Sequence, residues 1–326
     1  MKILVTGGAG YIGSVVVAQL VRENHTVTVL DNLSNGNRMA VSHDAELVVG
    51  DIADSAKLDS IFSSGRFDAV MHFAALIEAG ESMKSPERFF RNNTASTLTL
   101  LEAMLRAGVG RLVFSSTAAL YGNPDTVPIP EDAPLRPTNA YGESKLLVER
   151  MLAWMNSIHG LRYAALRYFN AAGATEELGE VHNPETHLIP LVLQAAAGTR
   201  PHISIFGTDY ATPDGTCVRD FIHVHDLAKA HLLALQGLQS RDKLVYNLGN
   251  GAGFSVRQVI EAASRITGRS IPVLECPRRA GDPATLVASS AKIRNELGWQ
   301  PEFSDPAGII RSAWEWHQRH PNGYGG

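Results

Sequence analysis

Cysteine is nearly absent from this chain, which has only Cys217 and Cys276 among its 326 residues. Two separated thiols do not make a disulfide framework or a cysteine cluster for zinc, so we expect neither disulfides nor a metal site. Long apolar runs are also missing, and no stretch could span a bilayer. Lys2 is followed by a strand pattern and glycines rather than by a leader and cleavage site, so we expect no signal peptide.

An excess of charge of either sign is missing as well. The 29 Lys and Arg residues nearly balance the 33 Asp and Glu residues, which leaves a net charge of −4. This balance gives no reason to expect nucleic acid or an anionic membrane as a partner. The composition is that of an ordinary globular protein, and we expect a cytoplasmic location.

What the chain does contain is a glycine-rich turn between two short apolar runs near its start. Lys2–Thr6 predicts a buried strand, Ser14–Glu23 a helix and Thr26–Leu30 a second strand. The turn between the first strand and the helix carries Gly7, Gly10 and Gly13. Glycines there let the backbone approach a pyrophosphate, and the helix N-terminus supplies free N–H groups. This βαβ unit therefore predicts a dinucleotide site.

Asp31 ends the second strand, 18 residues after Gly13. A carboxylate at this distance can accept a hydrogen bond from the 2′-hydroxyl of an adenosine ribose. The same carboxylate repels a 2′-phosphate, so we expect NAD rather than NADP. Asp51 follows a third strand, where it could bond an adenine or cap the next helix.

Strand and helix patterns continue to alternate after this unit. Such alternation predicts an α/β fold with a Rossmann-like, doubly wound parallel sheet. We expect residues 1–173 to form an NAD-binding domain and residues 174–326 mainly a smaller α/β substrate domain, with residues 220–250 returning to the first. The further expected strands are 46–50, 69–74, 111–115, 162–169 and 245–248, and the expected helices are 55–62, 86–107, 140–159, 188–197, 223–235, 256–267 and 307–317.

Three side chains in the middle of the chain have the pattern of a catalytic site. Thr117 follows the expected strand 111–115, and ligands of open parallel sheets bind beyond the carboxyl ends of the strands. Tyr141 and Lys145 are four residues apart in the next helix, so they share one face. A nearby lysine favours phenolate, and we expect Lys145 to lower the pKa of Tyr141. The alternatives are that Thr117 only caps the turn that follows, and that Tyr141 and Lys145 are an amphipathic pair on the surface of the helix. His72 is expected in the core.

Together these motifs resemble the UDP-glucose 4-epimerases, a group of the extended short-chain dehydrogenase/reductase proteins. The resemblance covers essentially the whole chain. The motifs that carry it are Thr6–Gly13, Leu30–Leu33, Gly50–Ile52, His72–Ala75, Gly80–Ser82, Phe114–Ser116, Ala140–Lys145, Leu166–Asn170, Phe206–Tyr210, Asp214–Thr216, Val218–Leu227, Tyr246–Gly249, Arg278–Asp282 and Trp314–His317.

The resemblance implies inversion of C4 of a UDP-hexose, with NAD as cofactor and a transient 4-keto sugar. It implies that Tyr141 exchanges the proton of the 4-hydroxyl, that Lys145 binds the nicotinamide ribose and that Thr117 bonds the 4-oxygen. It also implies a homodimer formed through the helices 86–107 and 140–159.

The resemblance further implies two sets of binding residues. The cofactor set is Gly7, Gly10, Tyr11, Ile12, Gly13, Asp31, Asn32, Leu33, Ser34, Asn35, Gly36, Asp51, Ile52, Phe73, Ala74, Ala75, Asn92, Ser115, Tyr141, Lys145, Tyr168 and Phe169. The UDP-sugar set is Thr117, Asn170, His187, Leu188, Ser204, Ile205, Phe206, Arg219, Arg279, Asp282 and Leu286.

Three positions depart from the pattern of the group. Thr117 stands where many members have serine and keeps the hydroxyl. Ile77 stands where many have lysine, which removes a charge near the cofactor or sugar. Leu286 lies at a pocket position that is often tyrosine in strict hexose epimerases and small in broader ones.

Three other functions remain open. A nucleotide-sugar dehydratase or decarboxylase normally has an acid soon after the strand-end hydroxyl, where this chain has Ala118 and Ala119. A 4-epimerase of UDP-N-acetylglucosamine, UDP-glucuronate or a UDP-pentose would differ only in its sugar pocket. A non-catalytic NAD-binding sensor would not need Thr117, Tyr141 and Lys145 together.

Overall fold

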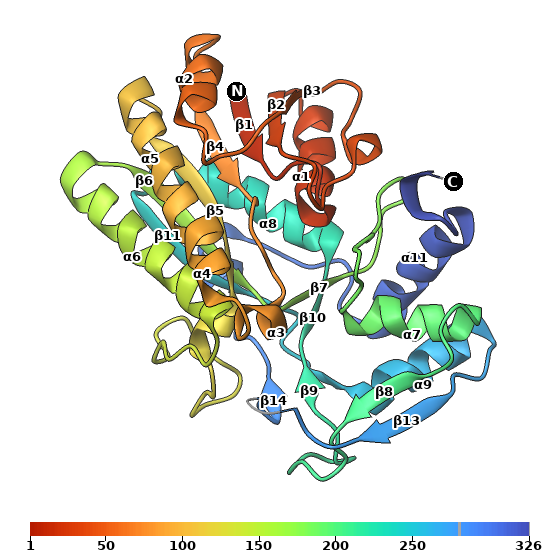
Figure 1. Cartoon of the computed structure of the whole chain (residues 1–326). Coiled ribbons are helices and arrows are strands. Elements are labelled where there is room, and N and C mark those ends of the chain that lie inside the picture. The colour runs from red at the N-terminus through yellow and green to blue at the C-terminus, as the bar shows by residue number, and fades with distance from the viewer. Residues whose placement is uncertain (280–281, 326) are drawn as a thin grey trace.

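The computed structural model describes residues 1–279 and 282–325. Its centre is a parallel sheet of seven strands in the order β11-β6-β5-β4-β1-β2-β3 (Figure 1). The strands are β1 (Lys2–Thr6), β2 (Thr26–Asp31), β3 (Glu46–Val49), β4 (Ala69–His72), β5 (Arg111–Thr117), β6 (Arg162–Tyr168) and β11 (Lys243–Leu248). This confirms the Rossmann-like sheet, and β1 and β4 flank the point where the strand order reverses.

Helices cover both faces of this sheet, because its strands are apolar on both sides. One face packs against α1 (Tyr11–Arg22) and α8 (Val224–Gly237), with Val16, Leu20 and Leu227 fully buried. The other face packs against α2 (Ser55–Ser63), α5 (Ser96–Ala107) and α6 (Ala140–His159). Over the described residues, none of the helices combines the length and apolar character that crossing a bilayer requires.

The expected helix 86–107 contains a change of geometry. It comprises α4 (Pro86–Phe89), a π-helical turn (Phe90–Ala95) and α5. A π turn adds a residue to the helical turn and is frequent at functional sites. Here it contains Asn92 and Asn93, and the Asn93 amide donates to the carbonyl of Leu76 across 2.9 Å. The turn therefore ties the helix to the segment that follows β4.

The C-terminal part forms a second, smaller layer below the sheet in Figure 1. Its core is built by three helices and a short parallel strand pair, with Val192, Val259 and Ile310 fully buried. β11, from the middle of this half, pairs with β6 in the main sheet. The α-helices and strands not yet named are α3 (Ala79–Ser82), α7 (Leu188–Ala197), α9 (Val256–Thr267), α10 (Ala291–Leu297), α11 (Pro306–Arg319), β7 (Asn170–Ala172), β8 (Ile203–Phe206), β9 (Val218–Arg219), β10 (Phe221–His223), β12 (Phe254–Ser255), β13 (Val273–Cys276) and β14 (Thr285–Leu286).

Candidate active site

A cavity of ≈ 350 Å³ opens at the carboxyl ends of the parallel strands. The glycine turn lines this cavity. Its glycines are required because neighbouring backbone atoms lie too close for a side chain. Gly7 has φ +74°, and a Cβ there would lie 2.4 Å from the backbone nitrogen of Ala74. A Cβ on Gly13 would lie 2.2 Å from the carbonyl oxygen of Gly7. A side chain at either position would force the turn apart, which would displace the N-terminus of α1.

Asp31 is fixed at one end of this cavity. Its carboxylate is 8% exposed and accepts backbone hydrogen bonds from Ala9 at 3.0 Å and Leu33 at 2.9 Å. Lys145 is the only Lys or Arg among the described residues that line the cavity. A site for a 2′-phosphate normally supplies an arginine, so the residues present fit NAD better than NADP.

The other end of the cavity holds the three expected catalytic side chains. The N-cap of α6 is Asn139, whose side chain accepts from the N–H of Gly142 at 2.8 Å. This cap fixes the first turn, where Tyr141 lies. Lys145, one turn later, is 2% exposed and donates to the carbonyl oxygen of Ser115 across 3.0 Å. The lysine therefore fastens α6 to the end of β5 beside Thr117.

Protonation of these groups differs from our expectation. Burial raises the pKa of Tyr141 above its usual value, and the Thr117 hydroxyl only partly opposes this effect. Burial also lowers the pKa of Lys145 to about 7. The expected lowering of the Tyr141 pKa is therefore wrong for the chain alone, because the burial of Tyr141 itself dominates.

The two hydroxyls at the end of β5 have separate partners. Thr117 accepts from the N–H of Ala119 at 3.1 Å, so it caps the turn after β5 and also faces the cavity. Ser116 donates to Glu149 across 2.6 Å, and Glu149 forms a buried ion pair with Arg167 at 2.6 Å. Ser116 is thus held in the core, which leaves Thr117 as the hydroxyl that the cavity presents.

Of the residues expected to bind the cofactor, all but Leu33 line this cavity. The side chain of Ile77 lies there too, where a lysine is common in the resembling group. Asp51 does not cap α2, as one interpretation suggested. The cap is Asp54, while Asp51 accepts from the side chain of Asn32 at 2.8 Å.

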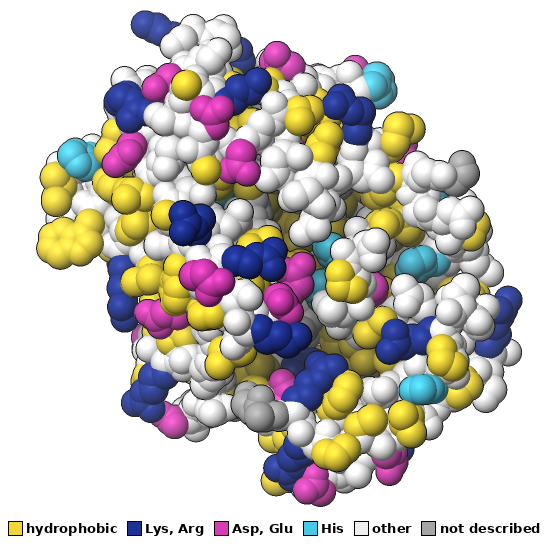
Figure 2. Space-filling view, in the orientation of Figure 1, with side chains coloured by type: hydrophobic (Ala, Val, Ile, Leu, Met, Phe, Trp, Pro, Cys, Tyr) yellow, Lys and Arg dark blue, Asp and Glu magenta, His cyan; other side chains and the backbone are white. Residues whose placement is uncertain are grey.

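A second cavity of ≈ 280 Å³ adjoins the first and shares Asn170, Ala171 and His187 with it. Figure 2 shows the hollow between the two layers, with Lys and Arg side chains along its lower rim. In this cavity Arg279 lies over the ring of Phe206, with 3.8 Å between guanidinium and ring centre. Arg219 pairs with Asp282 at 3.8 Å. Guanidinium groups on the wall of a cavity suit a diphosphate.

Two of the expected sugar-binding residues lie elsewhere. Ile205 is 1% exposed and belongs to the core of the C-terminal layer. Leu286 packs beside Tyr121 and Ile129 and lines neither cavity. The other members of the UDP-sugar set line one cavity or, in the case of Asn170 and His187, both. Residues 280 and 281, inside the motif Arg278–Asp282, lie outside the described residues.

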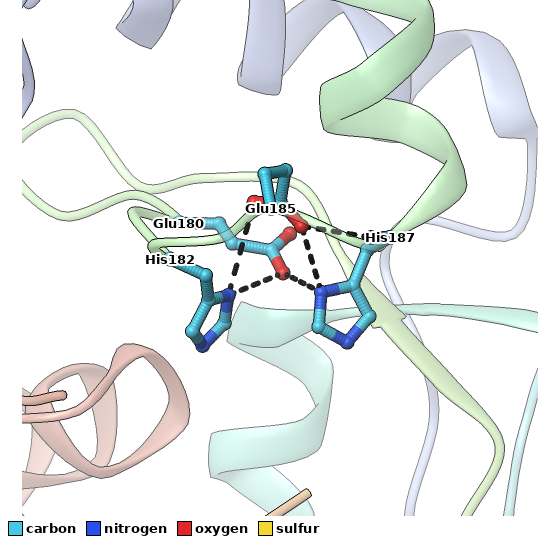
Figure 3. A group of neighbouring side chains, drawn as sticks. All are labelled: Glu180, His182, Glu185 and His187. Carbon is cyan, nitrogen blue, oxygen red and sulfur yellow. Dashed lines mark hydrogen bonds and ion pairs between the residues drawn. The ribbon is translucent and has the colours of Figure 1, made fainter. Parts of the chain in front are cut away.

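Sequence reasoning missed Glu180 and His182, which line the first cavity beside His187. Figure 3 shows these three side chains and Glu185 turned toward one another. The spacing E-x-H-x-x-E-x-H was visible in the sequence, but it lies in a proline-containing stretch without a helix or strand pattern. Burial lowers the pKa of His187, but its bonds with Glu180 and Glu185 outweigh this effect and raise the pKa to about 10.

His72 lies in the core, as expected. Its Nδ1 lies 2.6 Å from the hydroxyl of Thr6 and its Nε2 lies 2.8 Å from that of Thr97. Because the Thr97 hydroxyl already donates to the Asn93 carbonyl, Nε2 carries the proton and donates. Burial lowers the pKa of His72 to about 3, so it stays neutral.

Comparison with known proteins agrees with this geometry over the full length. The profile of the NAD dependent epimerase/dehydratase family matches residues 3–249. A UDP-glucose 4-epimerase of Streptomyces lividans is 54% identical over 99% of this chain and 98% of its own length. A solved structure of a UDP-glucose 4-epimerase superposes with a TM-score of 0.97 at 50% identity, covering 99% of each chain. The Brucella ovis UDP-glucose 4-epimerase, crystallised with NAD, gives 0.93 at 46% identity over 96% of this chain and 97% of its own.

Proposed function

The chain belongs to the NAD-dependent epimerase/dehydratase family, and from this premise we propose that it interconverts UDP-glucose and UDP-galactose by inverting C4 of the hexose. It is an isomerase that uses NAD. The observation that carries the proposal is that Tyr141, Thr117 and Lys145 all line the first cavity, which the second cavity adjoins. The first cavity has the glycine turn and the carboxylate of Asp31 that suit a dinucleotide. The second has arginines that suit a diphosphate.

NAD bound in the first cavity would take the hydride from C4 and return it. Tyr141, as phenolate, would accept the proton of the 4-hydroxyl and return it to the 4-oxygen, once the keto sugar has turned its other face to the returning hydride. The Thr117 hydroxyl would bond the 4-oxygen in both orientations. Lys145 would hold the ribose and supply positive charge beside the phenol. Burial raises the pKa of Tyr141 in the chain alone, so the proposed base role requires positive charge beside the phenol to favour phenolate.

The second cavity would bind the UDP part firmly and leave the hexose free to turn. Arg219 and Arg279 would hold the diphosphate, so the 4-keto sugar can rotate about its link and present its other face.

We also propose that residues 1–173 bind mainly the cofactor and residues 174–326 mainly the UDP-sugar. The cytoplasmic location expected from composition stays a prediction.

Substrate choice is tested by one assay. Purified protein is incubated with UDP-galactose, UDP-N-acetylgalactosamine and UDP-glucuronate side by side, and the C4 epimers are separated by chromatography. We expect the fastest conversion with UDP-galactose. Faster conversion of either other sugar would show a different 4-epimerase. Failure of all three with NAD present would favour the sensor function instead.

We propose that the protein forms a homodimer through α5 and α6. The support is an apolar surface on α6, where Trp154 is 67% and Ile158 66% exposed. Figure 2 shows apolar side chains at the left edge, over α6. Light scattering should give about twice the chain mass, and Trp154→Glu should reduce it to one chain mass. A monomeric wild type would contradict this proposal.

A further inference from the structure

We propose that Glu180, His182, Glu185 and His187 bind one zinc ion. All four residues lie within residues 180–187, in the segment that connects β7 to α7 (Figure 3). Each offers one ligand atom, and these atoms lie within 4.8 Å of one another. The ion would take no part in the proton and hydride transfers proposed above, although its ligand His187 lines both cavities. The proposal departs from our expectation of no metal site, which considered only the cysteines.

The distances between the ligand atoms suit a tetrahedral ion. Nδ1 of His187 lies 2.8 Å from Oε1 of Glu180 and 3.0 Å from Oε1 of Glu185. Nδ1 of His182 lies 3.1 Å from the same Glu180 oxygen and 3.8 Å from Oε2, the other oxygen of Glu185. Zinc bonds of ~2.0–2.1 Å separate tetrahedral ligands by about 3.3 Å. The four distances bracket this value, so small movements of the side chains would complete the site.

Charge also favours a divalent cation. The side chains of Glu180 and Glu185 are only 6% and 7% exposed. Among the described residues, their ion pairs are with the two histidines alone. Two buried carboxylates therefore need two positive charges from the imidazoles. A single divalent ion supplies both and leaves the imidazoles neutral, which is the form that ligates metals.

The donor set selects the metal. Imidazole nitrogen suits zinc, copper, iron and nickel, whereas calcium and magnesium prefer six or more oxygen ligands. Two imidazoles and two carboxylates match the four-coordinate sites of zinc. No further ligand is needed, so the ion would be structural.

The position of the site indicates what the ion would stabilise. The ring of His182 meets that of Tyr11, the first residue of α1, edge to face at 6.4 Å. His187 immediately precedes α7 and lines both cavities. A metal here would fix the wall that the two cavities share. Its removal should therefore weaken ligand binding more than it slows the chemical step at Tyr141.

The experiment uses full-length protein without a histidine tag, stripped with a chelator and titrated with ZnCl₂. We expect one zinc per chain by mass spectrometry and a rise in thermal midpoint on adding zinc. His187→Asn and Glu185→Gln should each weaken zinc binding by more than about 100-fold, because changes to groups that merely orient ligands already cost ~10–100-fold. His43→Asn is the control, since that side chain is 93% exposed and distant in sequence.

A second measurement does not depend on variants that fold. Co²⁺ added to the stripped wild type should give the intense visible absorption of a tetrahedral site, and zinc should displace it. A wild type that binds neither ion at one equivalent per chain would overturn the proposal and leave a network of His–Glu ion pairs. So would a folded His187→Asn protein that binds zinc as tightly as the control.

Discussion

Lys145 donates a hydrogen bond to the carbonyl oxygen of Ser115 across 3.0 Å and lies over the ring of Phe114 at 4.9 Å. This contact joins the first turns of α6 to the end of β5. It determines that Tyr141, one turn earlier, faces Thr117. The proposed chemistry depends on this arrangement, and each prediction below alters one part of the site.

Tyr141→Phe should lower kcat by about 10²–10⁴ with little change in UDP affinity, because the phenol oxygen moves a proton and does not anchor the nucleotide. Steady-state kinetics and UDP titration measure the two effects. Tyr163→Phe is the matched control, since Tyr163 is a buried tyrosine of β6 outside both cavities. A Tyr141→Phe enzyme within about threefold of wild type would remove Tyr141 from the acid/base role.

Thr117→Ser should stay active, whereas Thr117→Val should lose most activity. Serine keeps the hydroxyl that bonds the 4-oxygen, and valine keeps only the shape. Ser116 cannot replace it, because its hydroxyl is held by Glu149 at 2.6 Å. The ratio of kcat/KM between the two variants measures the effect. Equal activity would mean that a water molecule supplies the hydrogen bond.

Leu286 packs against the same apolar cluster as Phe169, which lines the first cavity, so we expect it to affect the preference between hexoses and their N-acetyl forms through that neighbour. Leu286→Tyr should suppress turnover of the N-acetylated pair, and Leu286→Ser should raise it by about 10-fold, the usual effect of small changes in pocket volume. The measurement is kcat/KM for the UDP-hexose pair and for the N-acetylated pair in wild type, Leu286→Tyr and Leu286→Ser. Because Leu286 lines neither cavity of the ligand-free chain, an unchanged ratio would place the N-acetyl group elsewhere.

Stability should fall on acidification below pH 6.5 because of buried neutral histidines. Burial lowers the pKa of His231 to about 4, against ~6.5 in the unfolded chain. Between these values the unfolded state binds the extra proton, so the free energy of unfolding decreases as pH falls. Between pH 6 and 4.5, His231→Phe should reduce the slope of the unfolding free energy against pH by about 1 kcal/mol per pH unit.

Urea unfolding at several pH values measures this slope. Phe retains the packing of His231 against Phe73, where the ring centres lie 4.9 Å apart. His43→Asn is the control variant for replacing a histidine, because that side chain is exposed. An unchanged slope in His231→Phe would show that His231 does not cause the acid sensitivity.

Much of the main sheet could be predicted from the sequence, because its strands are short apolar runs separated by glycines and helical periods. β1 was predicted at its observed bounds, and β11 was expected to return to the sheet. The π turn at Phe90–Ala95 could not be predicted, since its residues continue a helical pattern. The shift of its side chains depends on the tertiary contact between Asn93 and Leu76.

The site was predictable where local motifs determine it and not where burial does. The glycine turn and Asp31 depend on neighbouring residues, so spacing was enough. The pKa of Tyr141 depends on desolvation by distant elements, and spacing alone gave the wrong direction. Glu180 and His182 were missed for a related reason, because an irregular segment has no periodic pattern that would place its side chains.

The central claim is that Tyr141 moves only the hydroxyl proton, while the hydrogen on C4 leaves and returns within the closed site. The most direct test is to convert UDP-galactose in D₂O and examine C4 of the product by NMR. The account predicts that UDP-glucose carries no deuterium at C4. Deuterium at that carbon would contradict it, because it would mean that a base removes the C4 hydrogen as a proton that exchanges with solvent.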